Sequence, residues 1–248
     1  MPSSMRHYEM MGTLVLEFGH GEDADSAEAS VISSGSELKI KPLSTNVSDY
    51  YRELDCNTAI SKASYTYEGV KYRRESFVSA PAQLMVFHIA ADQDSMITFQ
   101  MRLMRISKRD NNCMDSIEQL KNGLLFTATV GGKDGVQLCC AARLNVVEGD
   151  VESIGDSVYV KNANAATILV GAETSFRHKD PRMKCLDLLD QHLPLAYSEL
   201  KTQHIEDYSS LFSRMQLRIG KQYSKLPTDE RLLSTASENF DDQNLFAL

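Results

Sequence analysis

Pairs of carboxylates are the residues through which this sequence could most directly do chemistry. Two acidic side chains on opposite sides of a bond can act as general acid and general base, and inverting hydrolysis of a glycosidic bond uses a pair held roughly 6.5–9.5 Å apart. The 248 residues include 34 Asp and Glu, so composition alone selects no pair. The two candidate pairs are Glu53 with Asp55 and Asp229 with Glu230. Both are better explained as solvated charges, as ion-pair partners of neighbouring arginines or as acids at a helix start, so no catalytic residue is assigned.

Histidines and cysteines are the next candidates, as metal ligands or general bases. The histidines do not stand at the short spacings that metal ligands adopt, so each is predicted to be a hydrogen-bonded structural residue. They are His7, His20, His88, His178, His192 and His204. The five cysteines form no C-x-x-C pair, and Cys139 and Cys140 are neighbours on a predicted strand, where they point to opposite faces. The sequence therefore predicts neither a metal nor a cofactor.

Three tyrosines could form a platform on which a sugar ring stacks: Tyr65, Tyr67 and Tyr72. Packing of aromatic rings across a hairpin explains them better. The chain contains no tryptophan, which weakens the case for a module that binds carbohydrate by itself but leaves it open.

The elements that would position these side chains are mostly strands. Apolar and polar residues alternate most clearly between Met96 and Met104, as in a sheet with one wet face. Glu68-Gly69 and Asn122-Gly123 predict hairpin turns, and Pro81 marks a chain corner. Many short strands with frequent turns favour an antiparallel β-sandwich. Strands are expected at residues 14–18, 63–67, 70–72, after 81, and at 96–104, 117–121, 124–130, 136–147, 151–154, 157–161 and 166–172, with loops at 19–36 and 105–116.

Helical signals begin near the end of the last expected strand. Asp180-Pro181 can cap and open one helix, Pro194 is expected to start a second, and Pro227 enters a third. A short strand is expected at 216–220. Apolar residues of the second helix recur at spacings of three and four. They are Tyr197, Leu200, His204, Tyr208, Leu211, Phe212 and Met215.

Composition limits the partners. The net charge of −8 argues against nucleic acid and anionic membrane surfaces, which need a basic face. The chain has no apolar run near the roughly 20 residues that span a bilayer, and its first residues carry no apolar signal core. The compartment stays undetermined.

Short motifs recur in a fixed order along nearly the whole chain, roughly residues 5–248. The central one is Tyr51-Arg52-Glu53-Leu54-Asp55, then Thr58-Ala59, then Gly69-Val70-x-Tyr72-x-Arg74-Glu75-x-Phe77-x-Ser79-x-Pro81. The others are Met5-Arg6-x-Tyr8, Gly12-x-Leu14-x-Leu16-x-Phe18, Thr174-Ser175-Phe176, His204-Ile205-x-Asp207-Tyr208-x-x-Leu211-Phe212-x-Arg214, Leu217-x-Ile219-Gly220 and Pro227-Thr228-Asp229-Glu230-Arg231-Leu232. Together they resemble the N-terminal region of glycoside hydrolase family 95, the family of inverting α-L-fucosidases and some related galactosidases.

The resemblance implies a mainly β chain with three parts. We expect an antiparallel β super-sandwich over residues 1–178 without the family's first segment, a helical linker over 179–220, and over 221–248 the start of a helical barrel that would continue beyond Leu248. In that family the catalytic acid and base lie in the barrel, so no catalytic position is carried onto this chain.

The function implied by the resemblance is that of a piece of an α-L-fucosidase-like hydrolase. The whole enzyme would remove terminal fucose from glycans with inversion, and its oligosaccharide substrate would bind the barrel. The β-domain would support the barrel and be inactive alone. The alternative is a stand-alone β-sandwich module that binds carbohydrate or another protein.

Overall fold

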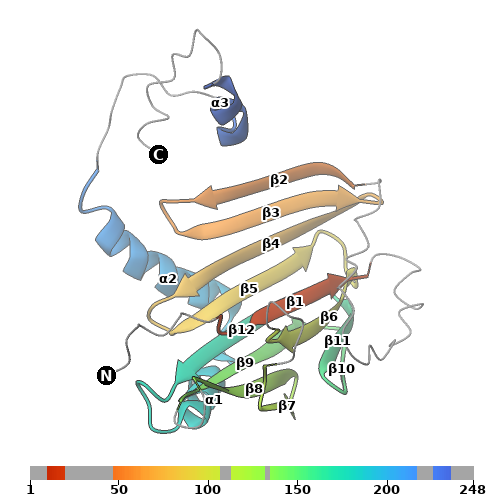
Figure 1. The fold of residues 1–248 in the computed structure, drawn as a ribbon. Coiled ribbons are helices and arrows are strands. Elements are labelled where there is room, and N and C mark those ends of the chain that lie inside the picture. Colours follow the sequence, from red (N-terminus) through yellow and green to blue (C-terminus); the bar gives the residue numbers. More distant parts are fainter. Residues whose placement is uncertain (1–9, 20–46, 107–112, 132–134, 217–225, 236–248) are drawn as a thin grey trace. The chain divides into compact units, whose positions relative to one another are not determined.

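Strands dominate the computed structural model, which describes residues 10–19, 47–106, 113–131, 135–216 and 226–235 (Figure 1). The chain divides into two compact units, one ending at Tyr208 and one beginning at Ser209. In chain order the described elements are β1 (Thr13–Phe18), β2 (Val47–Asp55), β3 (Ile60–Tyr67), β4 (Val70–Ser79), β5 (Leu84–Ala91), β6 (Ile97–Met104), β7 (Ser116–Leu120), β8 (Gly123–Val130), β9 (Val136–Val147), β10 (Asp150–Ile154), β11 (Ser157–Ala163), β12 (Ala165–Thr174), α1 (Pro181–His192), α2 (Tyr197–Phe212) and α3 (Thr228–Ser234).

All strand pairs are antiparallel, and they form two sheets. The smaller sheet has the order β1-β6-β11-β10, and the larger has the order β2-β3-β4-β5-β12-β9-β8-β7 (Figure 1). The predicted mainly β, antiparallel fold is confirmed. Among the described helices, none has the length and apolar character needed to cross a membrane.

Two apolar clusters lie on the two faces of the eight-stranded sheet. The inner face packs against the four-stranded sheet and buries residues such as Ile168, while the outer face packs against α1 and α2 and buries Leu169. Adjacent residues of a strand point to opposite faces, so a strand covered on both sides is apolar throughout. Cys139 lies in the outer cluster and Cys140 in the inner one, which confirms the prediction that they face apart.

The hairpin turns confirm one predicted register and correct another. Tyr67 pairs with Val70, so Glu68 and Gly69 form the turn, both with positive φ. In the next predicted hairpin the turn residues are Lys121 and Asn122, one position earlier than expected, because Gly123 already pairs with Leu120. Gly123 is required for space: a Cβ there would lie 2.3 Å from the Ala142 carbonyl oxygen.

Strand β2 was not predicted, and its sequence shows why. It is an edge strand of the larger sheet, and most of its residues are exposed. The register shifts between Ser48 and Tyr51, where Asp49 adopts a φ of 54°. A bulge interrupts the period-two pattern on which strand prediction depends.

The helices begin largely as predicted. The Asp180 carboxylate accepts a hydrogen bond from the Met183 amide at 2.9 Å, and Pro181 occupies the first turn of α1. Helix α2 begins at Tyr197, three residues after Pro194, and α3 follows Pro227. The apolar stripe predicted for α2 is only partly covered: Leu200 and His204 are buried, whereas its last members are exposed. Of the strand expected at 216–220, residues 217–220 lie outside the described residues, as do 20–36 of the expected loop.

Candidate functional site

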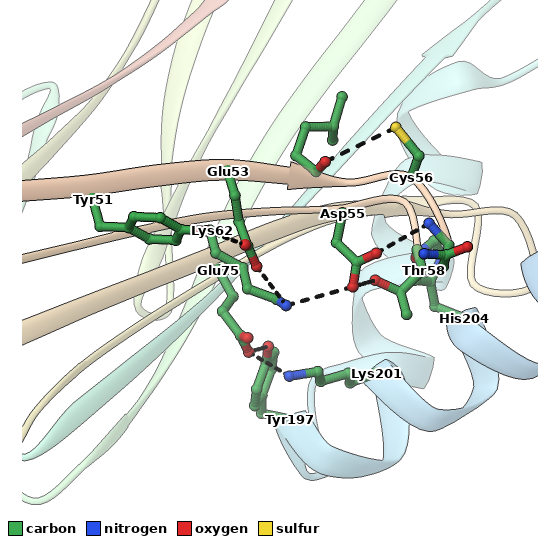
Figure 2. A network of polar contacts seen from close by, with 12 residues as sticks. Tyr51, Glu53, Asp55, Cys56, Thr58, Lys62, Glu75, Tyr197, Lys201 and His204 are labelled. Atoms are coloured by element: carbon green, nitrogen blue, oxygen red, sulfur yellow. Dashed lines mark hydrogen bonds and ion pairs between the residues drawn. The ribbon is translucent and has the colours of Figure 1, made fainter. Parts of the chain in front are cut away.

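A connected group of polar side chains lies on the outer face of β2, β3 and β4, where α2 crosses the sheet (Figure 2). Four α2 residues contact the strands, and they are spaced three or four apart, so they share one face of the helix. Tyr197 and Lys201 donate to Glu75, His204 approaches the Thr58 carbonyl at 2.9 Å, and Tyr208 donates to the Cys56 carbonyl at 2.8 Å. These contacts hold α2 against the strand β4 and the β2–β3 turn.

Glu75 is the most connected acid of this group. Its Oε2 accepts hydrogen bonds from the Tyr197 hydroxyl and from Lys201 Nζ, the latter at 2.6 Å. Burial raises the pKa of Glu75, but the bonds from Lys201 and Tyr197 outweigh it and hold the pKa below its ordinary value. Burial and the Glu75 charge both raise the pKa of Tyr197, so it stays a protonated donor. We call Glu75, Tyr197 and Lys201 the Glu75 trio.

A second trio repeats this chemistry at the exposed edge of the sheet. Glu53 accepts from the Tyr51 hydroxyl at 2.6 Å and from Lys62 Nζ at 2.9 Å (Figure 2). Lys62 also reaches Asp55 at 3.5 Å, and Asp55 accepts from the Thr58 hydroxyl at 2.8 Å. We call Glu53, Tyr51 and Lys62 the Glu53 trio. It differs from the Glu75 trio in that its donors come from the strand of Glu53 itself, β2, and from the neighbouring strand β3, instead of from a helix.

The two trios belong to one row of paired residues that crosses the sheet. Glu53 pairs with Lys62, Lys62 with Glu75, and Glu75 with His88. Glu53 and Glu75 are two strands apart, which places their backbones about 9–10 Å from each other. This is a distance between backbones and not between carboxylates, and Lys62 lies on the strand between the two acids.

The protonation states also argue against acid–base catalysis in this row. A glycosidase needs one carboxyl whose pKa is raised so that it holds a proton at neutral pH. Hydrogen bonds from Tyr51 and Lys62 lower the pKa of Glu53, and the bond from Thr58 lowers the pKa of Asp55. With Glu75 also lowered, all three are ionised at neutral pH. Glu53 and Asp55 are ion-pair partners as expected, but their cation is Lys62 of the next strand and not a neighbouring arginine.

The described histidines are engaged in structural contacts. His88 Nδ1 lies 3.0 Å from the Thr167 hydroxyl, and its ring stacks on Tyr197 at 3.8 Å between centroids. His204 stacks on Phe77 at 4.5 Å, and His192 Nδ1 lies 2.8 Å from the Leu188 carbonyl. His178 faces Glu173 at 3.5 Å. His7 and His20 lie outside the described residues.

The remaining candidates are also placed by the structure. Tyr65 and Tyr72 are cross-strand partners, buried, with ring centroids 5.2 Å apart, which confirms their packing role; Tyr67 is half-buried. Asp229 and Glu230 are exposed acids in the first turn of α3, as expected for charges at a helix start. In the part of the chain that is described, no cluster of three His, Cys, Asp or Glu could hold a metal ion.

Sequence reasoning missed the Glu75 trio as a unit. Glu75 appeared only within a motif, and Tyr197 only as a member of an apolar stripe. A weak signal was present, because Tyr197 and Lys201 stand four apart on one helix face and so could serve one acceptor. Which of the 34 acids that acceptor is depends on a contact across 122 residues, and no local pattern encodes it.

Two known protein families match successive parts of the chain. The sequence model described as "Glycosyl hydrolase family 65, N-terminal domain" matches residues 13–179, and that described as "Glycosyl hydrolase family 95 catalytic domain" matches residues 196–248. In three dimensions the chain is similar to a "Putative kojibiose phosphorylase from human microbiome", with a TM-score of 0.50 and 12% identity over 67% of this chain and 25% of that one. At this identity the likeness shows the fold alone.

Curated relatives point to the same group of enzymes. The chain is 26% identical to "Alpha-L-fucosidase 2" of Arabidopsis thaliana, over 75% of this chain and 25% of the relative. It is also 26% identical to "Probable alpha-fucosidase A" of Aspergillus niger, over 79% of this chain and 27% of the relative. The chain therefore spans about a quarter of the length of these relatives. The predicted relationship is confirmed: this chain belongs to the glycosyl hydrolases, with a family 65-type N-terminal domain over residues 13–179 that leads into a segment of the family 95 catalytic domain.

Proposed function

We propose that this chain is the β-domain and linker of an α-L-fucosidase-like glycoside hydrolase, and that it supports a helical catalytic domain without cleaving glycans itself. Hydrolysis of terminal fucose with inversion, and binding of the oligosaccharide, belong in this proposal to the helical domain. Its parts are a β-sandwich over 1–178, a helical linker over 179–220 and the start of the catalytic barrel over 221–248.

The contact between α2 and the sheet is the observation that carries the proposal. The match to the catalytic-domain family begins at residue 196, next to Tyr197, the first residue of α2. Four side chains of that helix then bond to β4 and to the β2–β3 turn. The β-domain thus holds the first helix of the matched segment in a fixed orientation, which is what a supporting domain must do.

The protonation states of the three acids in the described polar network support the inactive role. Glu53, Asp55 and Glu75 all have lowered pKa values, and none can hold the proton that a leaving sugar needs. Tyr65 and Tyr72 are packed against each other inside the fold, which removes the best candidates for a sugar platform.

The test is incubation of the purified chain with a 2′-fucosylated oligosaccharide, beside an active α-L-fucosidase as positive control. We expect no released fucose from the chain and no thermal stabilisation by the oligosaccharide at millimolar concentration, since a ligand bound only by the folded state must raise the Tm. Turnover that survives purification would refute the supporting role. A clear Tm increase without turnover would favour the stand-alone carbohydrate-binding module instead.

A further inference from the structure

The described residues cover the inner face of the eight-stranded sheet only in part beside β1. A cleft of about 290 Å³ opens there, between the inward side chains of β1 and the strands β3, β4 and β5. Leu14 and Leu16 line one wall, and Arg74 and Phe87 line the other. Beyond the cleft, Leu54 pairs with Ser61 on the same face and is 66% exposed. Among the described residues, this half of the inner face therefore lacks the second layer that the other half has.

Arg74 is a cation in this cleft that has no counter-ion among the described residues. Its Nη2 donates to the Tyr65 hydroxyl at 2.7 Å, and its guanidinium lies 3.7 Å from the centroid of the Phe18 ring. Its Nε is buried and has no hydrogen-bond partner, and among the described residues no carboxylate forms an ion pair with it. A partly buried cation without a counter-ion is costly. The cleft is therefore complementary to an anionic group.

Strand β1 offers a second unsatisfied feature at the same place. Among the strands that the structure describes, β1 pairs only with β6, and no described strand pairs with its other edge beside the cleft. Edge strands are usually protected by charges, prolines or bulges. The edge strand β2 has a bulge and several charges, whereas β1 has neither proline nor bulge, and Glu17 is its single charged residue.

We propose that the cleft is a docking site for an extended polypeptide strand, which pairs with the open edge of β1 and places a carboxylate side chain beside Arg74. Main-chain hydrogen bonds to β1 would supply affinity, and alternate side chains would enter the cleft, as in other cases of strand addition to a sheet edge. The proposal concerns this face alone and does not depend on the fucosidase function.

Other occupants fit these features less well. A sugar would place several hydroxyl groups against Leu14, Leu16 and Phe87 without partners. The β1 strand of a second copy would bring inward only apolar side chains, because Glu17 pairs with Gln100 and faces away from the cleft. A strand with apolar residues and one acid at alternate positions matches the edge, the walls and the cation together.

A labelled heptapeptide tests the proposal directly. It carries valine at positions two and six, glutamate at position four and threonine elsewhere, so its inward side chains are apolar, acidic and apolar in any register that brings the acid to Arg74. Titration of the full chain, followed by fluorescence anisotropy, should give saturable binding. Replacement of the glutamate by glutamine should weaken binding about tenfold, since a charge-assisted pair is lost.

Variants of the protein make the test specific. Arg74→Met should weaken binding about tenfold, whereas the matched change Arg73→Met, one residue away on the opposite face, should leave it unchanged. Ala63→Glu covers the case in which Arg74→Met fails to fold. Ala63 is the cross-strand partner of Arg74, so a glutamate there would occupy the guanidinium and weaken peptide binding similarly.

Three results would overturn the proposal. They are no binding of the peptide at about 1 mM, equal binding of the glutamate and glutamine peptides, and Arg74-dependent thermal stabilisation by acetate as large as that by the peptide. The last would make the cleft a site for small carboxylates in place of a strand.

Discussion

Arg74 and Glu75 are neighbours on β4 and face opposite sides of the same sheet, and their surroundings differ sharply. Glu75 points to the outer face, where α2 brings it a lysine and a tyrosine. Arg74 points to the inner face, where it meets two aromatic rings and no carboxylate of the described chain. Among the described residues, the outer face at β4 is thus covered by a helix, whereas the inner face at Arg74 is covered only in part.

The two trios also share their chemistry but differ in their surroundings. Glu53 and Glu75 each accept from one tyrosine and one lysine, but the Glu53 trio lies within the sheet at its edge and is the more exposed of the two, while the Glu75 trio joins the sheet to a helix. Exposed ion pairs contribute little, because water solvates both partners almost as well. The burial and the span of a contact, more than its chemistry, decide what it does for the fold.

The largest expected difference between the faces is in packing. Phe77 is 4% exposed in the outer cluster, whereas Phe87 is half-buried at the inner cleft. Phe77→Ala should lower the free energy of unfolding by about 3–5 kcal/mol, and Phe87→Ala by roughly half as much. Urea denaturation followed by circular dichroism measures both. Equal losses would mean that the inner face is as well covered as the outer one.

The Glu75 trio should give the next largest effect. Glu75→Gln removes the charge that holds Lys201 while conserving size, and should cost about 1–3 kcal/mol of unfolding free energy. Hydrogen exchange should show faster exchange of α2 amides, with β8 and β9 unchanged. Glu53→Gln is the matched control, because it alters the same chemistry at a more exposed site within the sheet, and it should change neither measurement. A similar effect of both changes would contradict the role assigned to burial.

Acidification should weaken the outer face. Burial lowers the pKa of His88, so the native state stays neutral while the unfolded chain takes up a proton below pH about 6.5. The unfolded state then binds more protons, so the free energy of unfolding decreases as the pH decreases, by at most about 1.4 kcal/mol per pH unit. Stability curves between pH 8 and 5 should therefore slope for the natural chain, and less for His88→Gln.

The stability that Glu75 contributes is expected to be lost at a lower pH than that of His88. The folded-state pKa of Glu75 is depressed, so its contribution is complete above the ordinary glutamate value of about 4.3 and is lost as pH falls through the folded pKa. The His88→Gln chain should keep this low-pH loss, and Glu75→Gln should lack its share of it. If Glu75→Gln loses as much stability below pH about 4 as the natural chain, the assignment is wrong.

The sequence predicted the secondary structure better than the contacts between its elements. Strand alternation at Ile97–Met104 and the cap at Asp180 depend on neighbouring residues, so local pattern was sufficient. Strand β2 was missed because its bulge breaks the alternation. The turn before Gly123 was misplaced because this glycine belongs to the strand, where a side chain would clash with Ala142 of the neighbouring strand.

The same limit applies to the functional reading. Glu75 and Arg74 have unremarkable neighbours in the sequence, and their roles differ only because of what packs above each face. Those partners, α2 on one side and β1 on the other, lie 122 and about 60 residues away in the chain. Motif resemblance identified the family because it compares whole arrangements, whereas spacing within one segment could not distinguish the two residues.

The smallest effect is expected for Arg74, and it is the sharpest test of the contrast between the faces. Arg74→Met loses one bond to Tyr65 and a cation–π contact with Phe18, together about 1–2 kcal/mol, but it also relieves the cost of a partly buried cation. The net change in unfolding free energy should therefore stay within about 1 kcal/mol. Arg143 is the matched cation on the outer face, where it is ion-paired with Asp190 of α1. Arg143→Met should cost more than Arg74→Met in the same denaturation experiment, because a formed pair is broken and no unpaired charge is relieved. If Arg74→Met lowers the unfolding free energy more than Arg143→Met, the charge of Arg74 is already compensated by other groups of the chain, and the inner face needs no further partner.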